Sequence, residues 1–198
     1  LDKHQGLSHA LNAGLSCCSN EWVARMDTDD ISLPSRFEAI ADFILKNPGV
    51  DIVGSLAIQI DENDRHKKIL KVPQNDRVIK KLIWTCPMIH PTVCYKKSSI
   101  LKVGGYDPKA GPRQDDYDLW YRCAAAGLRF FNIQTPLLLF RLTKRSFRKF
   151  TLKVGYYRFI TGFRGNKMNK LGPVAYLGIM IPLIRSLLPF PVNACFYN

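Results

Sequence analysis

The sequence lacks the cysteine patterns that mark zinc-bound or disulfide-bonded proteins. Six cysteines occur among 198 residues, but none forms a C-x-x-C pair, and Cys17-Cys18 are adjacent. This spacing excludes the usual zinc motifs and gives no disulfide framework. Free cysteines of this kind behave mainly as small buried hydrophobic residues, so we expect a reducing, cytoplasmic setting.

No acidic residue occurs after Asp118, although residues 119–198 hold 13 of the 29 lysines and arginines. Residues 1–118 hold all 16 acids and 16 bases, so the formal charge of +13 belongs entirely to the later part of the chain. The two parts therefore face different surroundings. The basic part is a candidate surface for an anionic membrane or a nucleic acid.

The basic part also lacks an apolar run that could cross a bilayer, since a spanning helix needs about 20 apolar residues. The uncharged stretch 171–184 has 14 residues, is interrupted by prolines and ends at Arg185. We expect residues 143–198 to form a helical tail that lies on a membrane surface, where basic side chains meet anionic lipid. The alternative is a helical cap on the preceding domain. No nucleic-acid-binding motif occurs, so we expect no nucleic-acid partner.

Residues 1–142 alternate short apolar strands with amphipathic helices, which predicts an α/β domain with a single core. The predicted helices cover residues 6–15, 34–47, 76–84, 98–103 and 117–126. The predicted strands cover residues 22–26, 50–60, 69–72, 92–95, 130–133 and 137–142.

Three carboxylates, Asp27, Asp29 and Asp30, directly follow the predicted strand 22–26. Ligands of α/β sheets bind outside the carboxyl ends of strands. Clustered acids repel one another unless a cation offsets their charge, and Mg²⁺ or Mn²⁺ prefers carboxylate oxygens and often bridges to substrate phosphates. The pattern indicates a metal–diphosphate site. The alternative is a helix N-terminus, where aspartate is a good cap.

Five ordered segments carry a resemblance to a known family. They are residues 6–15 (GLSHALNAGL), 26–37 (MDTDDISLPSRF), 90–93 (HPTV), 104–106 (GGY) and 115–120 (DDYDLW). In this order they resemble the family 2 glycosyltransferases, enzymes of the GT-A fold that use nucleotide-sugar donors. The resemblance covers about residues 1–142.

The resemblance implies a Rossmann-like mixed sheet flanked by helices. In the family, the strands that bind the nucleotide base and ribose precede the D-x-D motif, whereas only 26 residues precede Asp27 here. We therefore expect residues 1–142 to be a partial catalytic domain, the carboxy-terminal portion of a longer transferase, followed by the tail 143–198. A divergent short protein is the alternative.

The family's D-x-D motif binds the metal and contacts the donor ribose, which implies roles for the acidic cluster. We expect Asp29 and Asp27 to hold Mg²⁺ or Mn²⁺, with Asp29 as the main ligand and Asp27 also facing the nucleotide. Asp30 is either a further ligand or the cap of the following turn. His90 either contacts the diphosphate or acceptor, or holds a turn through its ring nitrogens. Arg113 either reaches a donor phosphate or is a solvated surface residue.

Asp115-Asp116 occupies the place where the family shows Glu-Asp, whose second acid is the general base. The resemblance implies that Asp116 deprotonates the acceptor hydroxyl. Asp115 is one carbon shorter than the family's glutamate, and its role beside Asp116 stays open. Two adjacent carboxylates can push one pKa upward, which would suit a base. The alternative is that these acids only decorate a helix N-terminus.

The implied activity is the inverting transfer of one sugar from a nucleotide-sugar to a hydroxyl of a lipid-linked glycan or a surface-polysaccharide precursor. The Q-x-x-R-W motif of processive family members does not follow Asp116, which favours a single transfer. We expect a cytoplasmic protein, peripheral at the inner face of the plasma membrane. The competing hypothesis is an inactive remnant or a non-catalytic glycan- or membrane-binding module.

Overall fold

The computed structural model describes residues 5–143 and 151–187, in which helices and strands alternate as the sequence predicts. The helices are α1 (Leu7–Cys17), α2 (Arg36–Lys46), α3 (Asp76–Lys81), α4 (Lys97–Lys102), α5 (Asp115–Ala125), α7 (Leu152–Met168) and α8 (Pro173–Ser186), with 3₁₀ turns η1 (Ile83–Thr85) and η2 (His90–Thr92). The strands are β1 (Trp22–Ala24), β2 (Ile31–Ser32), β3 (Ile52–Ile60), β4 (His66–Leu70), β5 (Cys94–Lys96) and β6 (Phe130–Arg141).

The strands form one mixed sheet in the order β1-β5-β3-β6-β2, and β4 pairs antiparallel with β3 as a hairpin. The long strands β3 and β6 run parallel in the centre, and the other pairs are antiparallel. Ile52, Val53 and Ile60 of β3 are fully buried, because helices and loops cover both faces of the sheet. The short strands β1 and β2 form opposite edges, so the acidic segment between them crosses from one edge to the other.

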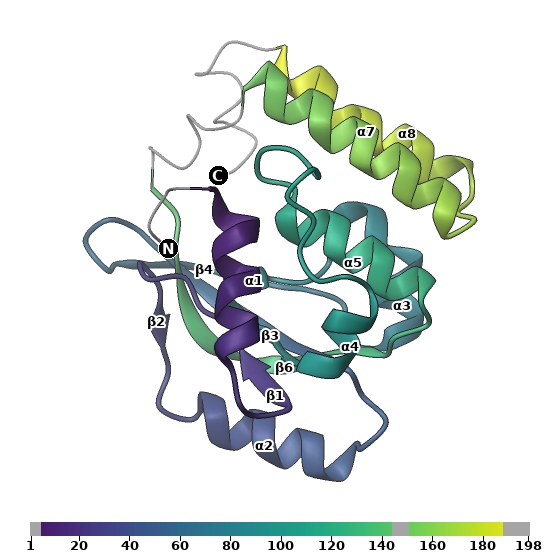
Figure 1. The fold of residues 1–198 in the computed structure, drawn as a ribbon. Coiled ribbons are helices and arrows are strands. Elements are labelled where there is room, and N and C mark those ends of the chain that lie inside the picture. Colours follow the sequence, from purple (N-terminus) through teal and green to yellow (C-terminus); the bar gives the residue numbers. More distant parts are fainter. Residues whose placement is uncertain (1–4, 144–150, 188–198) are drawn as a thin grey trace.

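Helices pack on both faces of the sheet (Figure 1). On one face α2 packs through Ile40 against Cys94 and Leu137, as its apolar stripe predicts. The other face carries the main core, to which α1, α4 and α5 contribute. This arrangement holds the first turn of α5 over the sheet.

Two of the element predictions are wrong. Residues 130–133 and 137–142 belong to one strand, β6, rather than two. Its register against β3 shifts near Pro136, where the missing N–H cannot join the ladder, so the strand continues through an irregularity. Helix α1 passes Gly14 and ends at Cys17, because Gly14 keeps helical backbone angles rather than ending the helix.

Helices α7 and α8 form a hairpin that packs outside α5 and η1 (Figure 1). Glycines allow the close approach: a Cβ at Gly165 would lie 2.3 Å from the Tyr121 ring, and one at Gly178 would lie 2.1 Å from the Trp84 ring. Of the predicted tail, residues 144–150 and 188–198 lie outside the described part. No helix in the described ranges combines the length and the apolar character needed to cross a bilayer.

Candidate active site

Asp27, Asp29 and Asp30 lie in the turn after β1, as predicted, and one carboxylate oxygen of each lies within 4.8 Å of the others. The backbone N–H of Arg141 donates to Asp30 Oδ1 at 2.8 Å, whereas Asp30 Oδ2 is buried and has no hydrogen-bond partner among the described residues. Burial raises the pKa of Asp30 to about 6; the Arg141 bond opposes the rise, and the charges of Asp27 and Asp29 add to it.

The acidic cluster fits a divalent cation. A buried oxygen without a partner, next to two further carboxylates, is an unfavourable arrangement that a cation would relieve. Oxygen donors of this kind suit Mg²⁺ or Mn²⁺. The exposed carboxylate of Asp29 makes no hydrogen bond or ion pair within the described residues, so both of its oxygens are available to a metal.

Arg25 forms an ion pair with the carboxylate of Asp27. Its buried guanidinium donates to both oxygens, at 2.9 and 2.5 Å. The backbone carbonyl of Arg25 accepts from Arg36 Nη2 at 2.7 Å, and the same nitrogen donates to the carbonyl of Pro91 at 2.9 Å. Because Arg36 is fully buried, these bonds fix the strand that leads to the acids against the η2 turn.

Asp116 lies in the first turn of α5. The backbone N–H of Tyr117 donates to its Oδ1 at 2.8 Å, and the Cys86 thiol donates to its Oδ2 at 3.6 Å. Burial raises the pKa of Asp116, and this rise is opposed by the charge of Arg158 on α7, by the Tyr117 bond and by the charge of Arg25. The carboxylate is therefore more basic than an ordinary aspartate, as a general base requires.

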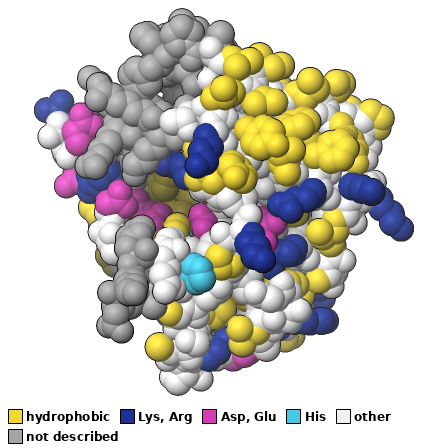
Figure 2. All heavy atoms as spheres, turned by 45° about the horizontal axis from the view of Figure 1, so that its top comes forward, with side chains coloured by type: hydrophobic (Ala, Val, Ile, Leu, Met, Phe, Trp, Pro, Cys, Tyr) yellow, Lys and Arg dark blue, Asp and Glu magenta, His cyan; other side chains and the backbone are white. Residues whose placement is uncertain are grey.

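Both the acidic cluster and Asp116 interact with Arg25, the first through hydrogen bonds to Asp27 and the second through its charge. This guanidinium holds Asp27 in a bidentate ion pair and is close enough to Asp116 to act on its pKa. Figure 2 shows acidic and basic side chains side by side where the large apolar surface borders the rest of the molecule. The charge of Arg25 therefore acts on both the acidic cluster and Asp116.

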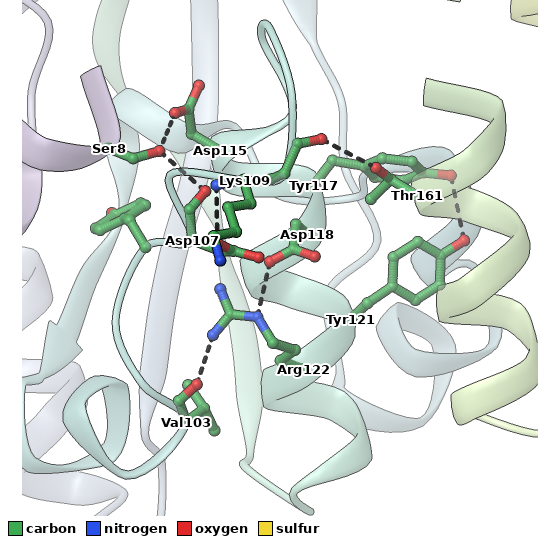
Figure 3. Close-up of polar contacts among 12 residues, drawn as sticks. Ser8, Val103, Asp107, Lys109, Asp115, Tyr117, Asp118, Tyr121, Arg122 and Thr161 are labelled. Atoms are coloured by element: carbon green, nitrogen blue, oxygen red, sulfur yellow. Dashed lines mark hydrogen bonds and ion pairs between the residues drawn. The ribbon is translucent and has the colours of Figure 1, made fainter. Parts of the chain in front are cut away.

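Asp115 has different partners from its neighbour Asp116. The Ser8 hydroxyl of α1 donates to the Asp115 carboxylate, and the two side chains point toward each other in Figure 3. Ser8 also donates to the backbone carbonyl of Asp107 at 3.3 Å. Asp115 therefore ties α1 to the start of α5.

His90 and Arg113 lie in different environments. His90 is buried, and its Nε2 lies 2.9 Å from the Tyr106 hydroxyl. Burial holds the pKa of His90 well below its ordinary value, so a neutral ring bonded to Tyr106 is the arrangement expected of a histidine that holds a turn. Arg113 is exposed in the turn before α5, with φ of 61°.

Three residues at the site were not predicted from the sequence. Arg25 precedes the acidic run by two residues, which was the one available signal. The sequence indicates that Cys86 is a small buried hydrophobic residue, but it adopts a left-handed φ of 62° beside Asp116. Arg158 belongs to the part of the chain expected to face a membrane, and the packing of α7 on α5 brings it to the ring of Tyr117, the neighbour of Asp116.

The fold is that of GT-A-type glycosyltransferases. The crystal structure of Staphylococcus aureus TarS 1-349 matches with a TM-score of 0.58 and 14% identity, covering 94% of this chain and 52% of that chain. The mannosyltransferase PcManGT from Pyrobaculum calidifontis, in complex with GDP-Man and Mn²⁺, matches with a TM-score of 0.52 and 18% identity, covering 95% and 51%. The predicted GT-A-like mixed sheet is therefore confirmed.

The sequence comparisons give the family. The model of Glycosyl transferase family 2 matches residues 1–104. The UDP-Gal:alpha-D-GlcNAc-diphosphoundecaprenol beta-1,3-galactosyltransferase of Escherichia coli is 38% identical over 150 residues, which cover 75% of this chain. The chain belongs to glycosyltransferase family 2, as its motifs predicted. It spans 54% of the length of that relative.

Proposed function

We propose that this chain is the catalytic and acceptor-binding part of an inverting glycosyltransferase, which moves one sugar from a nucleotide-sugar to a hydroxyl acceptor. The observation that carries the proposal is that Arg25 pairs with Asp27 of the acidic cluster and that its charge also acts on the buried carboxylate of Asp116. The E. coli relative is named for a UDP-sugar donor and a lipid-diphosphate acceptor, and PcManGT was solved with GDP-Man and Mn²⁺. These names support a nucleotide-sugar donor and an acceptor that is a lipid-linked glycan or polysaccharide precursor.

The acidic cluster is the proposed metal site of residues 1–142. Asp29 and Asp30 would hold Mg²⁺ or Mn²⁺, while Asp27, held by Arg25, lies beside them and faces the nucleotide. Bound there, the cation supplies positive charge to the diphosphate that leaves the donor. His90, bonded to Tyr106, is left with a structural role in this proposal, and Arg113 is a candidate contact of a donor phosphate.

Asp116 is the proposed general base. Its ionised carboxylate takes the proton of the acceptor hydroxyl, and the oxygen then attacks the anomeric carbon of the donor sugar. The new glycosidic bond forms as the bond to the nucleoside diphosphate breaks, and the proton later passes from Asp116 to water. A single displacement of this kind inverts the anomeric carbon.

Transfer is tested with the longest natural protein that contains this chain. UDP- and GDP-sugars are offered with sugar acceptors that carry a prenyl diphosphate, and products are measured by mass spectrometry and NMR. We expect the acceptor to gain one sugar with inverted anomeric configuration, only when Mg²⁺ or Mn²⁺ is present. A folded protein that transfers no sugar from any donor would contradict the proposal and favour a non-catalytic module.

The hairpin of α7 and α8 supports peripheral attachment to the cytoplasmic face of the plasma membrane. Its large apolar side chains are exposed, and Figure 2 shows a broad apolar surface. The exposed apolar residues are Leu152, Tyr156, Phe163, Met168, Val174, Leu177, Met180, Ile181, Ile184 and Leu187. The exposed bases of the hairpin are Lys153, Arg164, Lys167 and Lys170. An apolar face with basic residues suits an interfacial helix pair on anionic lipid.

Binding to vesicles tests this attachment. We expect co-sedimentation with vesicles that contain phosphatidylglycerol, weakened by high salt because screening removes the attraction of the bases. The double substitution Leu177→Glu and Ile181→Glu should reduce binding by about 10-fold or more, since two apolar side chains no longer enter the interface. Leu45→Glu on α2 is the control, because Leu45 is at least as exposed as the two substituted residues but lies outside the hairpin. Equal losses in both proteins, or binding to oligonucleotides instead, would contradict attachment through the hairpin.

A further inference from the structure

Arg158 is a cation of α7 whose position is fixed beside the proposed base. Its guanidinium carbon lies 4.2 Å from the centre of the Tyr117 ring. Tyr117 directly follows Asp116, is fully buried, and donates its hydroxyl to the carbonyl of Trp84 at 2.8 Å. Because this ring is immobilised and a guanidinium stacks well on an aromatic face, Arg158 has a defined place at the site.

The packing of α7 on α5 supports this placement. The Tyr121 hydroxyl donates to Asn166 Oδ1 at 2.7 Å, and Thr161 donates to the carbonyl of Ala110 at 3.4 Å. Figure 3 shows Tyr121 and Thr161 at the junction of the two helices. Both contacts lie on α7 within the three turns that follow Arg158 and involve buried residues, so the helix that carries Arg158 is held firmly against the α5 side of the molecule.

The N–H groups of the Arg158 guanidinium make no hydrogen bond to any described residue. The other arginine that acts on Asp116, Arg25, gives its guanidinium to Asp27. Arg158 makes no hydrogen bond or ion pair with any described residue, and the residue as a whole is partly buried. A guanidinium that stacks on a ring and whose N–H groups make no hydrogen bond to described residues is suited to an anion with planar or forked oxygens.

We propose that Arg158 binds a phosphate group of a substrate held at Asp116, an inference that rests on the proposed glycosyl transfer. Two substrates of that reaction carry such a group. A sugar acceptor linked to a lipid diphosphate would place its phosphates one sugar ring away from the hydroxyl that meets Asp116. The donor diphosphate is the other source. In both cases the hairpin of α7 and α8 contributes a side chain to the site, a role separate from its proposed contact with the membrane.

The experiment compares the wild-type protein with Arg158→Gln, Arg158→Lys and the control Arg164→Gln, an exposed arginine on the same helix. Each protein is given one acceptor sugar in two forms, a short prenyl diphosphate and a neutral alkyl glycoside. KM is measured for both forms and for the donor. Binding of inorganic diphosphate is measured by calorimetry without turnover. Thermal unfolding reports whether each variant is folded.

If the acceptor diphosphate is the ligand, Arg158→Gln raises KM for the prenyl diphosphate about 10- to 100-fold, as expected for a lost charged hydrogen bond. KM for the neutral glycoside and for the donor stays the same. A rise confined to the donor identifies the donor diphosphate as the ligand. In either case inorganic diphosphate binds more weakly to Arg158→Gln, with Arg158→Lys between it and wild type.

The proposal is overturned if Arg158→Gln binds inorganic diphosphate as wild type does, or changes KM for the two acceptor forms equally. The second result would mean that Arg158 only packs α7 onto Tyr117. Should Arg158→Gln unfold, Arg158→Lys gives the same comparison with the charge retained. A wild-type protein that transfers no sugar refutes the proposed function, whereas a wild-type transferase with unaltered Arg158 variants refutes this inference alone.

Discussion

Asp116→Asn is expected to lower kcat by about 100- to 10,000-fold, the range that a positioned general base contributes. Asparagine is nearly the same size and can still accept the Tyr117 N–H, but it cannot take the acceptor proton. Donor affinity should not change, because the base faces the acceptor in the proposed reaction. Steady-state kinetics with calorimetric donor binding measure both quantities.

Asp118→Asn is the matched control for this substitution. Asp118 lies one half-turn further on α5, but its carboxylate accepts from Arg122 Nε at 2.7 Å, and Figure 3 shows it pointing toward that arginine. Loss of this ion pair should lower the free energy of unfolding slightly and leave kcat nearly unchanged. Unchanged turnover in Asp116→Asn, or equal losses in the two variants, would show that Asp116 is not the base.

The pH profile gives an independent check on Asp116. The group acts as a base only when ionised, so activity should be full above its pKa and fall as the pH drops through it. Because burial raises this pKa, the acidic limb of kcat/KM should lie above the position expected of an ordinary aspartate. Arg158→Gln should move the limb to still higher pH, since the charge of Arg158 lowers the pKa of Asp116.

The fold was largely predictable because local patterns agree with it. The apolar stripe of α2 and the β-branched run of β3 each specify one element and one buried face. The element predictions fail where contacts with a neighbouring strand or helix determine where an element ends. Pro136 resembles a strand break in the sequence, but its pairing with β3 lets β6 continue with a shifted register.

Of the candidate site, the sequence predicts only the acids. Asp27, Asp29 and Asp116 belong to recognisable motifs, whereas the arginines around them do not. Arg36 reaches the carbonyls of Arg25 and Pro91 across 11 and 55 residues of sequence. Arg158 reaches Tyr117 only because glycines let α7 approach α5. Such contacts depend on tertiary packing, which spacing along the chain does not encode.

Asp29→Asn is expected to raise the Mn²⁺ concentration for half-maximal activity by about 100-fold or more, beyond the 10- to 100-fold typical of losing a residue that only supports a metal ligand. The amide keeps the size of the side chain but offers no negative charge to a cation. Direct Mn²⁺ binding, followed by electron paramagnetic resonance without substrates, should weaken in parallel. Glu38→Gln, an exposed acid on α2 outside the cluster, is the control.

Stability measurements separate loss of a metal ligand from general damage to the turn. In wild type, Mn²⁺ should raise the melting temperature, because a ligand that binds only the folded state stabilises it. Without metal, Asp29→Asn should be at least as stable as wild type, since the charge of Asp29 is one of those that raise the pKa of the buried Asp30. Adding Mn²⁺ should then stabilise the variant far less. A variant that melts lower without metal, yet still gains stability from Mn²⁺ as wild type does, would mean that Asp29 shapes the turn and binds no cation.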